Sequence, residues 1–349
     1  MRFRHIAYAA ITLAALPQIV APCHAAAKPL AYTGVNIAGG EFFDPAKTPD
    51  PVYGKNFTYP TLAELQYFAG KGMNVVRIPF RWETLQPEPK KPLRASEVTR
   101  LREVVDQATK LGLCVLLDPH NYARYFDKVI GSADVRNDVF ADFWQRMALE
   151  FKDNNHVWFG LVNEPHDMPT EQWVNAANAA IAAIRSVGST NLILVPGNGW
   201  TGTGGWSDTW YGGANSEWML KIADPKRNYW IEVHCYLDQD SSGSHAEVAS
   251  ETIGVERIAK FTAWCRDHHV KAFLGEIGVA SDERSHAALE NMLTAMERDQ
   301  DVWQGFTWWA AGAWWGDYMY TLEPKDNVDR PQMAWLEPHL HGMKSAPKP

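Results

Sequence analysis

Two glutamates stand where short apolar segments of the sequence end. Glu164 closes the run "VWFGLVNEP", which begins at Val157, and Glu276 closes "KAFLGEIG", which begins at Lys271. Two facing carboxylates suit glycosidic bond cleavage, because one can deliver a proton to the leaving oxygen while the other acts as nucleophile or base. A separation of about 5 to 5.5 Å between the carboxyl groups would indicate retention of configuration, and roughly 6.5 to 9.5 Å would indicate inversion. Either chemistry needs a fold that brings these distant residues together.

Eight apolar runs rich in β-branched residues predict eight strands. They begin at Tyr32, Met73, Leu113, Val157, Asn191, Tyr229, Lys271 and Val302. Amphipathic stretches in most of the gaps predict helices at Thr61 to Gly70, Ser96 to Leu111, Val139 to Asn154, Glu171 to Val187 and Val255 to His268. Strands that are apolar on both faces and alternate with helices are typical of a parallel sheet.

Eight strand-helix units are the number found in a closed (β/α)8 barrel, so we predict an α/β fold, a single-domain TIM barrel. The alternative is a doubly wound open sheet with a Gly-rich phosphate turn after its first strand. The segment "GVNIAGGEF" has glycines at that place but lacks the required spacing.

Residues able to bind or catalyse occur at the predicted end of strand after strand. In chain order they are Asn36, Arg77, His120 and Asn121, Asn163 and Glu164, Asn198, His234 and Tyr236, Glu276, and Trp308 and Trp309. Each alone has a plain structural interpretation, since an Arg or His at a strand end more often satisfies loop carbonyls. Their joint recurrence favours one site, because the carboxyl ends of barrel strands converge at one face.

Metal-dependent catalysis and a serine nucleophile are the alternatives to paired carboxylates. His120, His234 and the two glutamates could bind a divalent metal, but the sequence has no HxH or HExxH spacing. A serine nucleophile would call for a GxSxG elbow, which is absent from the sequence. We therefore expect neither a metal nor another cofactor.

The amino-acid composition indicates what kind of molecule the protein binds. The 349 residues carry a net charge of -8 with no basic stretch, so nucleic acid is not an expected partner. Sixteen tryptophans, many in polar Gly-rich segments such as "GWTGTGGWSDTWYGG", favour a flat ligand.

The N-terminus predicts export. Arg2 and Arg4 precede an apolar stretch and small residues, which is typical of a secretory signal over residues 1–25 with cleavage near 25–27. We therefore expect a secreted protein, extracellular or periplasmic, that has no membrane association after cleavage and is a monomer with its catalytic domain over residues 28–349. Cys114, Cys235 and Cys265 remain at unpatterned spacings and are expected to be buried thiols, although one pair could bridge.

Eight segments in order resemble glycoside hydrolase family 5, and most closely its endo-β-1,4-glucanases, the cellulases. They are "GVNIAGGEF", "VVRIPFRWETLQP", "LLDPHNYARY", "GLVNEPHDM", "ILVPGNGWTG", "EVHCYLDQDSSG", "FLGEIG" and "WWAAGAWWGDYMYTLEP". The resemblance runs from about Tyr32 to Pro324 and implies a retaining endoglucanase acting on β-1,4-glucan or cello-oligosaccharides.

The resemblance implies a role for particular residues. Glu164 corresponds to the general acid/base and Glu276 to the nucleophile. The residues that surround the sugar at the cleavage point correspond to Arg77, His120, Asn163, His234 and Tyr236. Trp309 corresponds to the stacking platform, and Trp314 and Trp206 are expected to be further platforms.

These roles agree with the side-chain chemistry. Arg77 can orient Glu276 and keep it ionised, Asn163 can bind the sugar 2-hydroxyl, and Tyr236 can donate to Glu276. Two alternatives stay open: a related β-glycanase acting on mannan, xyloglucan or mixed-linkage glucan, and a non-catalytic carbohydrate-binding barrel.

Overall fold

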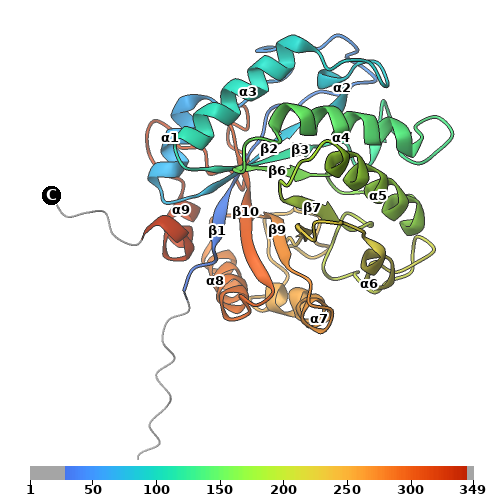
Figure 1. The fold of residues 1–349 in the computed structure, drawn as a ribbon. Helices are drawn as coiled ribbons and strands as arrows, with labels where there is room; N and C mark the ends of the chain where they lie inside the picture. The colour runs from blue at the N-terminus through green and yellow to red at the C-terminus, as the bar shows by residue number, and fades with distance from the viewer. Residues whose placement is uncertain (1–27, 344–349) are drawn as a thin grey trace, which may run out of the picture.

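The computed structural model describes residues 28–343, and these residues contain a closed barrel of eight parallel strands (Figure 1). The order around the barrel is β1-β10-β9-β8-β7-β6-β3-β2. The strands are β1 (Tyr32–Ile37), β2 (Val75–Phe80), β3 (Cys114–Pro119), β6 (Val157–Gly160), β7 (Ile193–Pro196), β8 (Tyr229–His234), β9 (Ala272–Ile277) and β10 (Trp303–Ala311). The predicted (β/α)8 fold is confirmed, and all eight predicted strands are present.

Helices surround the barrel and bury its outer surface (Figure 1). The longer ones are α1 (Leu62–Gly70), α3 (Ala95–Lys110), α4 (Asn137–Phe151), α5 (Thr170–Ser186), α7 (Ile253–Asp267) and α8 (Glu283–Arg298). The short ones are α2 (Trp82–Leu85), α6 (Asn215–Trp218) and α9 (Pro331–Leu336), with single 3-10 turns at Met219–Lys221, Glu337–His339 and His341–Met343. The five predicted helices match α1, α3, α4, α5 and α7 to within about three residues, and α8 was not predicted.

A two-stranded hairpin also lies outside the prediction. It consists of β4 (Arg124–Tyr125) and β5 (Lys128–Val129), which pair antiparallel. Phe126 and Asp127 form its turn with φ of 44° and 61°, the left-handed values that a two-residue hairpin turn requires. Strands of two residues are too short to leave a periodic signal, and this turn lacks the usual glycine.

The side chains inside the barrel change from apolar to charged along the barrel axis. Near the N-terminal ends of the strands, an apolar cluster closes the barrel; it includes Val75, Leu116, Trp158, Leu194 and Phe273. Near the C-terminal ends the buried interior side chains are charged, namely Arg77, Asp118, Glu232 and Glu276. The apolar layer therefore forms a floor beneath a charged layer, which is where a barrel of this kind carries its active site.

Three further expectations concern the chain as a whole. Cys114, Cys235 and Cys265 are free thiols in the structure; Cys235 and Cys265 are buried as expected, whereas Cys114, the first residue of β3, is partly exposed. None of the helices within residues 28–343 is both long and apolar enough to cross a membrane. The predicted export signal over residues 1–25, and its cleavage near 25–27, lie outside the described residues.

Candidate active site

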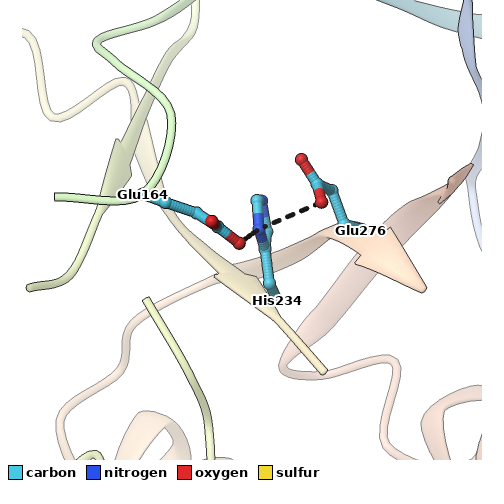
Figure 2. A group of neighbouring side chains, drawn as sticks. All are labelled: Glu164, His234 and Glu276. Atoms are coloured by element: carbon cyan, nitrogen blue, oxygen red, sulfur yellow. Dashed lines mark hydrogen bonds and ion pairs between the residues drawn. The ribbon is translucent and has the colours of Figure 1, made fainter. Parts of the chain in front are cut away.

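The fold brings Glu164 and Glu276 together at the C-terminal face of the barrel, with His234 between them (Figure 2). His234 Nδ1 lies 2.7 Å from Glu164 Oε1 and 3.5 Å from Glu276 Oε2. A carboxylate oxygen of Glu164 lies within 4.8 Å of one from Glu276. The two carboxylates that the sequence places 112 residues apart (276 minus 164) therefore face each other across a single side chain.

Backbone geometry places each glutamate differently. Glu276 is part of β9, so the regular strand fixes its direction. Glu164 lies beyond the end of β6 with φ of 40°, a left-handed conformation that is uncommon for a residue with a side chain. The backbone amide of Asn163 donates to the Pro119 carbonyl at 2.9 Å and anchors this turn to the neighbouring strand β3. Strained backbone of this kind is often found at functional sites, where the surrounding structure maintains it.

Arg77 and Tyr236 hold both oxygens of Glu276. An Arg77 terminal nitrogen lies 3.0 Å from Glu276 Oε1 and also donates to Asn36 Oδ1 at 2.8 Å. The Tyr236 hydroxyl donates to Glu276 Oε2 at 2.6 Å. A carboxylate fixed by two donors and paired with a buried guanidinium is oriented for attack on one atom, as a nucleophile must be.

Arg77 also sets the orientation of Asn163. Its second terminal nitrogen donates to Asn163 Oδ1 at 2.8 Å, which assigns the oxygen side of this amide. Within the described residues, the buried Asn163 Nδ2 has no hydrogen-bond partner. The amide is thus left with a free donor beside Glu164, as a contact to a substrate hydroxyl requires.

His120 is buried and held by Asp118. Its Nδ1 lies 2.8 Å from Asp118 Oδ2, and its ring stacks on Trp309 with centroids 5.3 Å apart. Burial lowers the pKa of His120 to about 3, so the ring is neutral at neutral pH. Burial raises the pKa of Asp118 to about 7, although Arg77 opposes the rise.

His234 has the opposite protonation state. Burial alone would lower its pKa, but Glu276, Glu164 and Glu232 together raise the pKa of His234 to about 10. Glu164, His234 and Glu276 are close enough together to ligate one divalent ion. A doubly protonated imidazole has no lone pair for a metal, so the charge on His234 favours proton chemistry over metal binding at neutral pH.

The predicted aromatic platforms differ in exposure. Trp309, in β10, is partly exposed next to His120, and its peptide bond to Ala310 is cis. Trp314 is 39% exposed, with its ring 6.4 Å from Phe42. Both rings are thus accessible to a ligand at the C-terminal face.

The expected role of Trp206 as a platform is wrong. Trp206 is 2% exposed, and its ring packs 4.8 Å from Phe261 and 5.3 Å from Trp264 of α7. Its loop folds inward here because Gly197 has no side chain: a Cβ at Gly197 would lie 2.6 Å from the Trp206 ring. Trp206 therefore belongs to the core under the loop.

Trp200, in the same loop, has the exposed ring that was expected of Trp206. It is 43% exposed, and its ring stacks on His166 with centroids 4.6 Å apart and planes inclined by 7°. The Trp200 backbone amide donates to the Pro165 carbonyl at 3.0 Å, which ties this loop to the residue that follows Glu164. Because loop residues have no periodicity, the sequence could not distinguish the outward from the inward tryptophan.

Two buried acids, Asp118 and Glu232, were also missed. Each lies two residues before a predicted site histidine, His120 or His234, on the same strand face. Residues two apart on a strand point to the same face, so each predicted site histidine could have indicated the acid two residues before it.

Comparisons with known proteins agree with this geometry. The sequence model of Cellulase (glycosyl hydrolase family 5) matches residues 24–312. The chain therefore belongs to glycosyl hydrolase family 5. The predicted family and enzyme class, a glycoside hydrolase of the endoglucanase type, are confirmed.

Relatives and solved structures cover most of the chain. A probable endo-β-1,4-glucanase B of Neosartorya fischeri is 37% identical over 312 residues, 88% of this chain and 91% of that protein. The structure of XacCel5A in complex with cellopentaose has a TM-score of 0.86 at 46% identity, covering 89% of this chain and 99% of that one. The endo-β-1,4-glucanase Xac0029 of Xanthomonas axonopodis pv. citri has a TM-score of 0.88 at 43% identity, covering 90% and 100%.

Proposed function

We propose that this enzyme is a secreted, retaining endo-β-1,4-glucanase that hydrolyses internal bonds of cellulose and soluble β-glucans by double displacement. The observation that carries retention is the approach of Glu164 and Glu276 oxygens to within 4.8 Å of each other. Inverting enzymes need about 6.5 to 9.5 Å between the carboxyl groups to admit a water molecule, whereas retaining enzymes need about 5 to 5.5 Å. The glucanase activity is supported by relatives named endo-β-1,4-glucanase and by the cellopentaose complex of a similar protein.

In the first step, Glu276 attacks the anomeric carbon while Glu164 protonates the leaving glycosidic oxygen. Arg77 aligns the attacking carboxylate, since it lies 3.0 Å from Glu276 Oε1. The free Asn163 amide donor can bind the sugar 2-hydroxyl, a contact that strengthens in the transition state. The product of this step is a glycosyl ester on Glu276.

In the second step, Glu164 takes a proton from water, which attacks the same carbon and releases Glu276. Tyr236 assists the departure because its hydroxyl already donates to Glu276 Oε2. The neutral ring of His120 and the partly exposed ring of Trp309 form an aromatic surface for the sugar face.

Secretion is supported by the N-terminal sequence alone, with Arg2 and Arg4 ahead of an apolar stretch. We propose export as a monomer. A mature N-terminus near residues 25–27 in the culture fluid or periplasm would support export, and an uncleaved chain in the cytoplasm would refute it.

Initial rates on carboxymethylcellulose, barley mixed-linkage glucan, xyloglucan and β-mannan test the substrate. We expect carboxymethylcellulose or barley glucan to be hydrolysed fastest, with an early fall in viscosity that indicates internal cleavage. Faster hydrolysis of β-mannan would refute the glucanase assignment. Binding without release of reducing sugar from any of them would identify a non-catalytic barrel.

A pair of tryptophan variants tests the corrected aromatic site. Trp200→Ala should raise KM for cello-oligosaccharides by about two- to twelvefold, equivalent to the ~0.5–1.5 kcal/mol of an aromatic contact, with little change in thermal stability. Trp206→Ala should instead lower the free energy of unfolding by about 3–5 kcal/mol, because it empties a core position. KM values and thermal unfolding of both variants distinguish the roles, and the reverse pattern would restore Trp206 as the platform.

A further inference from the structure

Glu232 is a buried carboxylate beneath the catalytic pair that has no role in the two steps above. It lies on β8, is 1% exposed, and points into the barrel on the same face as His234. Its Oε1 lies 3.0 Å from Arg77 Nε and 3.6 Å from His234 Nε2. Within the described residues, neither Glu232 oxygen has a hydrogen-bond partner. The side chain is therefore held by opposite charge alone.

A glycine on a neighbouring strand makes room for this carboxylate. A Cβ added at Gly275 of β9 would lie 2.3 Å from Glu232 Oε1 and 2.9 Å from His234 Nε2, which is too close for either contact. Gly275 directly precedes Glu276 in the sequence, so the strand that supplies the nucleophile is also shaped to admit Glu232 beside His234.

The geometry around His234 calls for an imidazolium. Its Nδ1 faces Glu164 at 2.7 Å and its Nε2 faces Glu232 at 3.6 Å. A neutral imidazole carries one N–H, so donating from Nδ1 to Glu164 would leave the Nε2 lone pair facing the Glu232 carboxylate. Protonation of both nitrogens replaces that repulsion with an ion pair.

Other charged groups surround Glu232 and His234. Arg77 of β2 lies between Glu232 and Asp118 of β3 and pairs with both, and Glu276 of β9 lies beside His234. Burial alone would raise the pKa of Glu232, but Arg77 and His234 hold it below its ordinary value. Glu232 therefore contributes a permanent negative charge to a cluster that contains both catalytic glutamates.

We propose that Glu232 is a positioning residue that keeps His234 doubly protonated and aligned between Glu164 and Glu276, and thereby sets the pH range of hydrolysis. The catalytic consequence rests on the proposed function. The protonation state of His234 does not depend on the proposed function, and it can be measured without substrate.

The test is Glu232→Gln, which keeps the side-chain shape and removes the charge. Removing a negative charge lowers the pKa of every neighbouring titratable group, so both limbs of the kcat–pH profile should move to lower pH by about one unit. We expect kcat at the wild-type optimum to fall about 10- to 100-fold while KM changes by less than about threefold. Glu232→Asp, which keeps the charge, should keep the wild-type pH profile even if kcat falls.

A matched control is Glu97→Gln, which neutralises a buried carboxylate of α3 outside the site and should leave the profile unchanged. Side-chain 15N NMR measures the protonation state of His234 directly. The His234 signal is assigned from its absence in a His234→Gln variant. We expect doubly protonated His234 at pH 8 in the wild type and a lower titration midpoint in Glu232→Gln.

An unshifted pH profile in a folded Glu232→Gln variant would overturn the proposal. A neutral His234 in the wild type at pH 7 would also overturn it, whether or not the variant folds. Absence of any glucan hydrolysis by the wild type would instead refute the proposed function and leave the NMR result to decide the state of His234.

Discussion

Replacement of Glu276 by glutamine is expected to lower kcat on β-1,4-glucans by about 10⁴-fold or more, because a neutral amide cannot form the glycosyl ester. The loss should be equally large on aryl cellobiosides with good leaving groups, since attack on the anomeric carbon is needed whatever leaves. Initial rates on both substrate types measure this effect.

The control for Glu276→Gln is binding. The isosteric side chain can still meet both partners, which lie within 3.0 Å of the native carboxylate. Its oxygen accepts from Arg77, and its NH2 group donates to the Tyr236 hydroxyl. Cello-oligosaccharide affinity, measured by calorimetry, should therefore remain within about tenfold of the wild type. Activity within tenfold of the wild type in a folded variant would contradict the assignment of Glu276 as nucleophile.

Replacement of Glu164 by glutamine is expected to have an effect that depends on the leaving group. Hydrolysis of cello-oligosaccharides should fall about 10²- to 10⁴-fold, because the departing sugar hydroxyl needs a proton. Formation of the glycosyl ester from dinitrophenyl cellobioside should continue near the wild-type rate, because that phenolate leaves without protonation. Burst kinetics on the aryl substrate distinguish this step from the slowed release of the ester.

The same loss on both substrates would contradict the role of Glu164 as general acid. His234→Asn is an informative comparison, since it removes the ring 2.7 Å from Glu164 Oε1 and leaves both carboxylates in place. Its activity should fall on both substrate types, because that ring contacts Glu276 as well.

The barrel and the catalytic pair could be predicted from the sequence for a physical reason. Strands buried on both faces leave continuous apolar runs, and their carboxyl ends must meet at one face, so residues that end each run are brought together. Glu164, Glu276 and Tyr236 lie at or just beyond such ends, whereas Arg77 lies in the middle of β2 and reaches them with its long side chain. The structure brings all four into contact through His234 and Glu276.

The parts that could not be predicted depend on side-chain direction in irregular segments. Trp200 and Trp206 stand six residues apart in one Gly-rich loop, yet one is 43% exposed and the other 2%. Their directions follow from packing against His166 and against α7, which is tertiary information. Glu232 is a different case, because it stands two residues before His234 on the same strand, and this spacing was visible in the sequence.

The most direct test of the two-carboxylate account is the anomeric configuration of the glycosyl azide that Glu164→Ala forms from dinitrophenyl cellobioside in azide. Azide needs no general base, so it can attack the ester on Glu276 when Glu164 is missing. Two displacements at one carbon give the β-azide, so we expect this product by proton NMR together with a restored rate. An α-azide from Glu164→Ala, or a β-azide with restored rate from Glu276→Ala in place of Glu164→Ala, would contradict it.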